Sequence, residues 1–109
     1  MSNPNDLTPA QKMIGEFAPK LVQLNDDVLF ADVWERKELS PRERSLITVS
    51  SLIAGGNTEQ LGFHFNKAKV NGLTEEELIE VITHLAFYAG WPKAMSAITV
   101  AKELFSEEK

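Results

Sequence analysis

The sequence predicts an all-α protein of about six helices. Three observations carry this prediction: helix-start signals recur along the chain, apolar residues follow each of them at helical spacing, and no segment alternates with period two long enough to form a strand. The 109 residues fit a single domain spanning residues 1–109.

The first helices are predicted around a proline break. Thr8 caps a helix that has Pro9 at its first position, and an apolar stripe with helical spacing follows as far as Val28. Pro19 interrupts this stripe, because a proline disfavours the helical conformation of the residue before it. Two helices are therefore expected to meet near residues 18–20.

The middle of the chain predicts a helical hairpin. Ser40 and Glu43 form a capping box, in which each side chain satisfies the other residue's backbone amide. The helix that follows is expected to stop at Gly55-Gly56, and Asn57 or Thr58 caps the next helix, which ends at Gly72.

A second capping box, at 74–77, opens the most apolar segment, residues 78–88. A helix that is apolar on nearly every side is expected to be buried on nearly every side. In so short a chain, one flank of it is expected to face another subunit. Gly90-Trp91-Pro92 then ends this helix and begins the last one.

Composition excludes several classes of function. The chain has no cysteine, which removes disulfides, thiol nucleophiles and Cys-ligated metals. With 11 Lys+Arg against 16 Asp+Glu, its net charge is 11 − 16 = −5, and without a basic cluster no nucleic-acid partner is expected. No apolar run is long enough to span a membrane, and residues 1–6 lack the pattern of a signal peptide, so we expect a cytoplasmic protein.

His64 has two interpretations. It shares a helix stripe with Leu61, so it is either a buried core imidazole or an acid–base group. The second interpretation places it behind an anion seat, formed by residues 55–57 and the amides of 58–60 at a helix start, with Arg44 helping. His84 and Tyr88, one turn apart, are expected to pack in the core unless they contact a ligand. Neither histidine has the spacing of a metal site.

Together, four segments resemble the carboxymuconolactone decarboxylase family over residues ~30–105: LSPRERSLIT at 39–48, GNTEQLxxHxxxA at 56–68, NGLTxEELxEV at 71–81 and YAGWPxA at 88–94. The resemblance implies a helical subunit of the alkylhydroperoxidase D-like fold in a ring-like homo-oligomer, a trimer or hexamer. The thiol branch of this family has two cysteines where this chain has Asn57 and Gln60, and a glutamate at the position of Ser45. The absence of cysteine therefore excludes dithiol peroxidase activity.

The decarboxylase branch that the chain resembles needs no cofactor and acts on a small anionic lactone. The resemblance implies a lyase in aromatic-compound catabolism, with His64 and Glu59 as catalytic residues. The expected substrate-binding residues are Arg44, Gly56, Asn57, Gln60, His84, Tyr88 and Trp91. Family decarboxylases carry Asn-His where this chain has Met95-Ser96. Two alternatives stay open: an enzyme acting on another lactone or quinone-like ligand, and a non-catalytic helical oligomer that binds a ligand.

Overall fold

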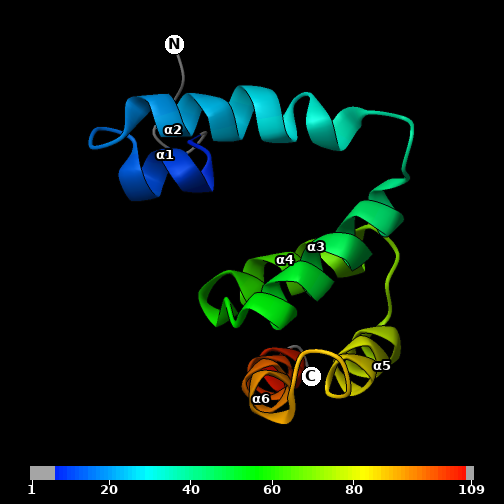
Figure 1. Ribbon diagram of the computed structural model, residues 1–109. Helices are drawn as coiled ribbons and strands as arrows, with labels where there is room; N and C mark the ends of the chain where they lie inside the picture. The colour runs from blue at the N-terminus through cyan, green and yellow to red at the C-terminus, as the bar shows by residue number, and fades with distance from the viewer. Residues whose placement is uncertain (1–6, 108–109) are drawn as a thin grey trace. The chain divides into compact units, whose positions relative to one another are not determined.

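The computed structural model describes residues 7–107, and Figure 1 shows its helices. The α-helices are α1 (Pro9–Ile14), α2 (Pro19–Gln23), α3 (Pro41–Gly55), α4 (Thr58–Val70), α5 (Glu75–Leu85) and α6 (Trp91–Glu107). Residues 7–107 contain no β-strand, so the all-α prediction with about six helices is confirmed. Within the same residues, every helix is too short or too polar to cross a bilayer.

The chain forms two compact units, Met1–Leu39 and Ser40–Lys109, and each is described by itself. The prediction of a single domain over residues 1–109 stays a prediction.

The first unit confirms the proline break. The Thr8 hydroxyl accepts a hydrogen bond from the Gln11 amide, and the Gln11 side chain accepts one from the Thr8 amide, so α1 begins with a complete capping box. α1 ends at Ile14 and α2 begins at Pro19. A π-helix at Leu24–Phe30 and a 3-10 turn at Val33–Glu35 follow, and the sequence pattern predicted neither.

The α3–α4 hairpin has the predicted ends. The Ser40–Glu43 capping box is present, and α3 stops where Gly56 adopts φ +71°, a backbone conformation that residues with a Cβ rarely take. At the far end of the hairpin, the Asn71 side-chain amide donates to the hydroxyl of the fully buried Ser45 over 3.0 Å. The start of α3 therefore lies beside the end of α4, as in an antiparallel pair.

The structure corrects the prediction for residues 78–88. The Thr74–Glu77 capping box is present, but α5 ends at Leu85. The Leu85 carbonyl then accepts hydrogen bonds from the amides of Tyr88 and Ala89, which closes a turn before α6. Only Leu78 and Ile82 of α5 are buried in the single chain. The predicted helix through residue 88 is therefore wrong, and the expectation that one flank of this segment faces another subunit stays a prediction.

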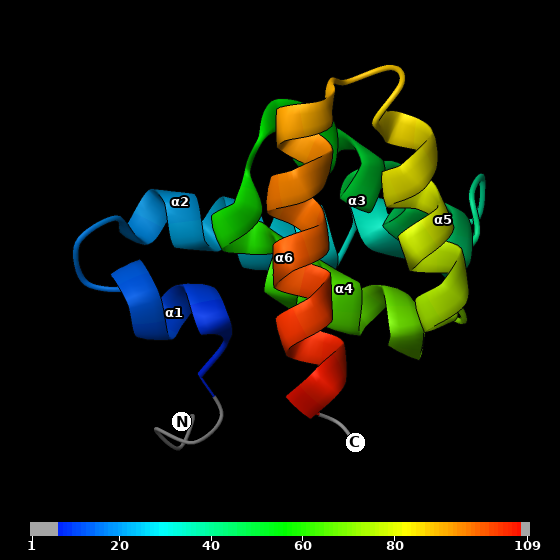
Figure 2. The same cartoon turned by 90° about the horizontal axis from the view of Figure 1, so that it is seen from below.

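All four helices of the second unit contribute to its core. Figure 2 shows α5 and α6 side by side, joined by the turn at 86–90. The helix α6 presents alanines and Phe105 to the core, so that α4 and α5 approach it closely. The core residues are Val49, Ile53, Leu61, Phe65, Ala68, Leu73, Leu78, Ile82, Ala94, Ala97, Ala101 and Phe105.

Candidate functional site

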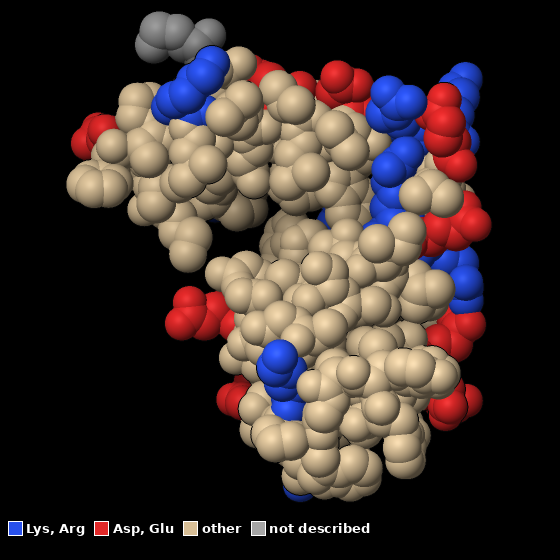
Figure 3. All heavy atoms as spheres, viewed as in Figure 1, with Lys and Arg blue, Asp and Glu red and all other residues tan. Residues whose placement is uncertain are grey.

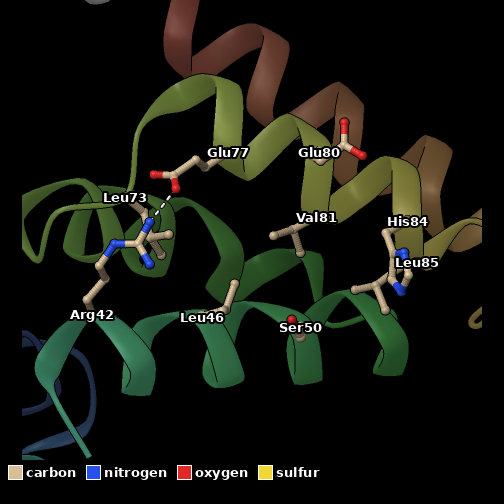
Figure 4. Close-up of a pocket in the computed structure, with 9 residues that line it drawn as sticks. All are labelled: Arg42, Leu46, Ser50, Leu73, Glu77, Glu80, Val81, His84 and Leu85. Atoms are coloured by element: carbon tan, nitrogen blue, oxygen red, sulfur yellow. Dashed lines mark hydrogen bonds and ion pairs between the residues drawn. The ribbon is translucent and has the colours of Figure 1, made fainter.

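A groove of about 420 Å³ lies between α3 and α5. Figure 4 shows its side chains: one stripe of α3 faces one stripe of α5, with a guanidinium at one end and an imidazole at the other. Its lining residues are Arg42, Leu46, Ser50, Leu73, Glu77, Glu80, Val81, His84 and Leu85. A volume of this size is within the range of small-molecule sites.

An ion pair holds the first end of the groove. Arg42 near the start of α3 donates to the Glu77 carboxylate in the first turn of α5. Glu77 also accepts the Thr74 amide in the capping box. The bond from the Thr74 amide, followed by the bond from Arg42, holds the pKa of Glu77 below its ordinary value. Glu77 therefore stays ionised and joins the starts of two helices.

The other end of the groove leads to exposed aromatic rings. The rings of His84 and Tyr88 stack with their centroids 4.9 Å apart, and Phe87 meets Trp91 edge-on at 6.4 Å. Tyr88 is 79% exposed and Trp91 61%. The expectation that His84 and Tyr88 pack in the core is therefore wrong, because His84 lies on an exposed face of α5 and Tyr88 follows the end of that helix at Leu85.

His64 lies on α4 at the boundary between core and surface. The side chains of Leu61, Phe65 and Ala68 on the same helix are buried, whereas His64 is half-buried. The Phe63 ring meets the imidazole edge-on, with the centroids 4.9 Å apart. Burial, and then the positive charge of Lys67 one turn further along α4, lower the pKa of His64 below its ordinary value.

The structure does not bring Glu59 to His64. Both residues belong to α4 and are five positions apart, which rotates their side chains by roughly 140° around the helix. Glu59 is exposed in the first turn. Within one chain, Glu59 is therefore not the carboxylate that holds a proton on His64.

The structure does not bring Arg44 to the start of α4, where the anion seat is predicted. Gly56, Asn57 and Gln60 are exposed there, but the Gln60 amide already donates to the Asn57 carbonyl over 3.3 Å. Arg44 is in the first turn of α3, about 16 Å along the helix axis from Gly55. The predicted cooperation of Arg44 with the seat is wrong for a single chain, because α3 separates them by its length.

The groove contains residues that sequence analysis did not select as site residues. Arg42 and Glu77, which are bonded to each other at one end of the groove, are not among the predicted site residues. A signal was present: Arg42, Leu46 and Ser50 repeat every four residues, which places them on one face of α3. The position of α5 opposite this face had no sequence signal. Among residues 7–107, no group of three His, Asp or Glu side chains is arranged to hold a metal ion.

Residues 19–103 match the model of the carboxymuconolactone decarboxylase family. The chain belongs to this family. It is 37% identical to 4-carboxymuconolactone decarboxylase of Acinetobacter baylyi over 78 residues, which are 72% of this chain and 58% of that protein. It is 31% identical to nitrosuccinic acid decarboxylase npaB of Metarhizium robertsii over 99 residues, 91% of this chain and 62% of that one. The chain thus spans about six-tenths of the length of these two relatives, and the family resemblance seen in the sequence is confirmed.

Proposed function

We propose that this family member is a decarboxylase that acts on a small organic acid bearing an electron-withdrawing group. One observation carries the proposal: two relatives with different named substrates, a carboxymuconolactone and nitrosuccinic acid, are both named decarboxylases. A lactone carbonyl and a nitro group have a chemical property in common, since each can accept an electron pair from a neighbouring carbon.

The proposed reaction has two steps. The bond between a substrate carbon and its carboxylate breaks, CO₂ leaves, and the electron pair moves into the electron-withdrawing group. A proton is then added to the carbon. The protein must bind an anion, stabilise the charge that develops on the substrate, and deliver that proton. Because the substrate itself holds the electron pair, the proposed chemistry uses no cofactor.

In this proposal His64 delivers the proton and Lys67 attracts the substrate anion. The lowered pKa of His64 makes its imidazole mostly neutral near pH 7 in the free protein. A substrate carboxylate placed beside Lys67 would offset the ammonium charge and raise the pKa of His64 again. The imidazole would thus gain its proton as the anion binds. We keep the predicted role in substrate binding for the following residues: Gly56, Asn57, Gln60, His84, Tyr88 and Trp91.

The test is release of CO₂ by the full chain from a panel of acids: 4-carboxymuconolactone, nitrosuccinate and, as a control without an electron sink, succinate. We expect turnover of at least one of the first two and none of succinate. As pH rises, kcat/KM should fall around a pKa below 6.5, and kcat should fall at a higher pH, because the bound anion raises the pKa of His64.

If another lactone or a quinone-like compound is turned over while the two named acids are inert, the alternative of an enzyme acting on a different ligand would be favoured. If no compound is turned over while ligands still bind, the non-catalytic oligomer would be favoured instead.

We also propose that the chain forms a homo-oligomer through the turn between α5 and α6. Phe87, Tyr88, Trp91 and Met95 are each at least half-exposed there, and a cluster of apolar side chains of this kind is typical of an interface. On the face in Figure 3, much of the surface of the second unit carries neither acid nor base. Sedimentation should give a trimer or hexamer at micromolar concentration, and Trp91→Ser should shift it toward the monomer.

A further inference from the structure

Of the residues with a role in the proposed reaction, only His84 lines the groove between α3 and α5. His64 is not among its lining residues, and each of its two ends carries polar groups on either side of an apolar floor. We propose that this groove binds an elongated organic acid whose carboxylate contacts Arg42, whose apolar body lies on Leu46 and Val81, and whose far end reaches Ser50 and His84.

Arg42 decides the charge of the ligand. A guanidinium carries five N–H groups, so the bond to Glu77 leaves donors for a ligand, and the Arg42 side chain is 44% exposed. Glu77 accepts from the Thr74 amide through one oxygen and from Arg42 through the other. Its charge is thereby matched within the protein, and Arg42 presents the hydrogen-bond donors at this end.

Glu80, which lies between Glu77 and His84 along α5, does not compete for this role. In Figure 4 the Glu80 carboxylate points away from α3, whereas Arg42 and His84 mark the two ends of the groove. A carboxylate on Arg42 would form charge-assisted hydrogen bonds, which are stronger than those of a neutral amide.

The spacing of the polar groups sets the length of the ligand. Arg42 and Ser50 are eight residues apart on α3, which corresponds to about 12 Å along the helix. Leu46 lies midway between them on the same face, opposite Val81 of α5. A ligand with a polar group at each end, or a carboxylate and a planar ring, fits this arrangement better than a compact ion does.

The test uses three probes of the same shape: 4-phenylbutanoate, 4-phenylbutanamide and 4-phenylbutylamine. Each is titrated into the full-length ¹⁵N-labelled chain, and backbone amide shifts are followed by NMR. We expect the acid to bind most tightly and to shift amides in residues 42–50 and 77–85. Arg42→Gln should weaken the acid by about tenfold or more, since it removes a charge-assisted bond, and should leave the affinity for the amide unchanged.

Two further variants distinguish the contribution of the Arg42 charge from that of the open space in the groove. Ser50→Phe should block both the acid and the amide by filling the groove, while Arg42 keeps its charge. Arg36→Gln is the matched control, because Arg36 is also an exposed arginine paired with a glutamate, at 3.5 Å from Glu38. It should bind the acid as the unmodified chain does. The dispersion of the amide spectrum reports whether each variant is folded.

Three results would overturn the proposal: equal binding of acid, amide and amine; amide shifts confined to the start of α4; or the same loss of acid binding in Arg36→Gln as in Arg42→Gln. The proposal does not rest on the decarboxylase function, so failure here leaves the turnover assay unaffected.

Discussion

The two histidines of this chain show how far one residue type is altered by its surroundings. His64 sits half-buried on α4 between core residues and Lys67, and its pKa is lowered by burial and by that charge. His84 is exposed at the last turn of α5, stacked on Tyr88, at the end of an open groove.

The difference teaches that candidate chemistry follows environment and not residue type. Partial burial next to a cation makes the protonation of His64 depend on what binds beside it. The exposed, stacked ring of His84 is suited to contact a ligand through its face and its nitrogens. We therefore propose that proton transfer takes place at α4 and ligand contact at α5.

The largest expected effect is on turnover. His64→Gln should lower kcat by about 10²–10⁴-fold, because it removes the proton donor of a general acid step. His84→Gln should cause a smaller loss in kcat, since it removes a contact and no proton. Initial rates of CO₂ release at saturating substrate measure both.

Melting temperature and sedimentation of the two variants serve as controls and should stay close to those of the unmodified chain. If His64→Gln fails to fold while its soluble fraction keeps full specific activity, His64 is a core residue and its assignment to catalysis is wrong.

The next largest expected effect is on the free energy of unfolding, and it tests whether α4 is anchored in the core next to His64. Phe65 is fully buried and packs against Phe105, with ring centroids 5.8 Å apart. Phe65→Ala should reduce the free energy of unfolding by about 3–5 kcal/mol, through lost burial and the cavity that it leaves. Val70→Ala on the same helix should change it by less than about 0.5 kcal/mol, because Val70 is exposed. Urea unfolding measures both, and equal losses would contradict the assigned core.

A smaller effect on stability is expected to distinguish the start of α5 from the start of α4. Thr74 caps α5 through a bond to the Glu77 amide, whereas Asn57 precedes α4 without a side-chain cap bond. Thr74→Ala should therefore cost about 1 kcal/mol of stability. Asn57→Ala should stay within about 0.5 kcal/mol, as for other surface substitutions. A larger loss for Asn57→Ala would show that its side chain supports the turn at Gly55 and Gly56.

The smallest expected effect is on the pH dependence of folding stability. In the folded chain the pKa of His64 lies below its ordinary value near 6.5, so the unfolded chain binds more protons between these two values. The contribution of His64 to stability is then present above pH 6.5 and is lost as pH falls through the folded pKa. Lys67→Gln should raise the pKa of His64, because it removes a repelling charge. An NMR titration of the imidazole protons measures this, and a pKa that does not move in Lys67→Gln would contradict the assigned cause.

Local signals in the sequence determined most of the helix boundaries. The capping boxes at Thr8, Ser40 and Thr74, and the stop at Gly56, depend on residues within one turn of each other, so they can be identified without the rest of the fold. The family could also be identified, because its motifs are short and occur in order along the chain.

Only the tertiary structure decided where the chemistry-bearing side chains lie. The end of α5 at Leu85 exposes Tyr88, which apolar periodicity had assigned to a buried helix. The length of α3 separates Arg44 from the start of α4, and the packing of α3 against α5 brings Arg42 to Glu77, 35 residues further along the chain. Capping and periodicity act over a few residues, whereas a groove between helices depends on how distant segments pack, which no local pattern encodes.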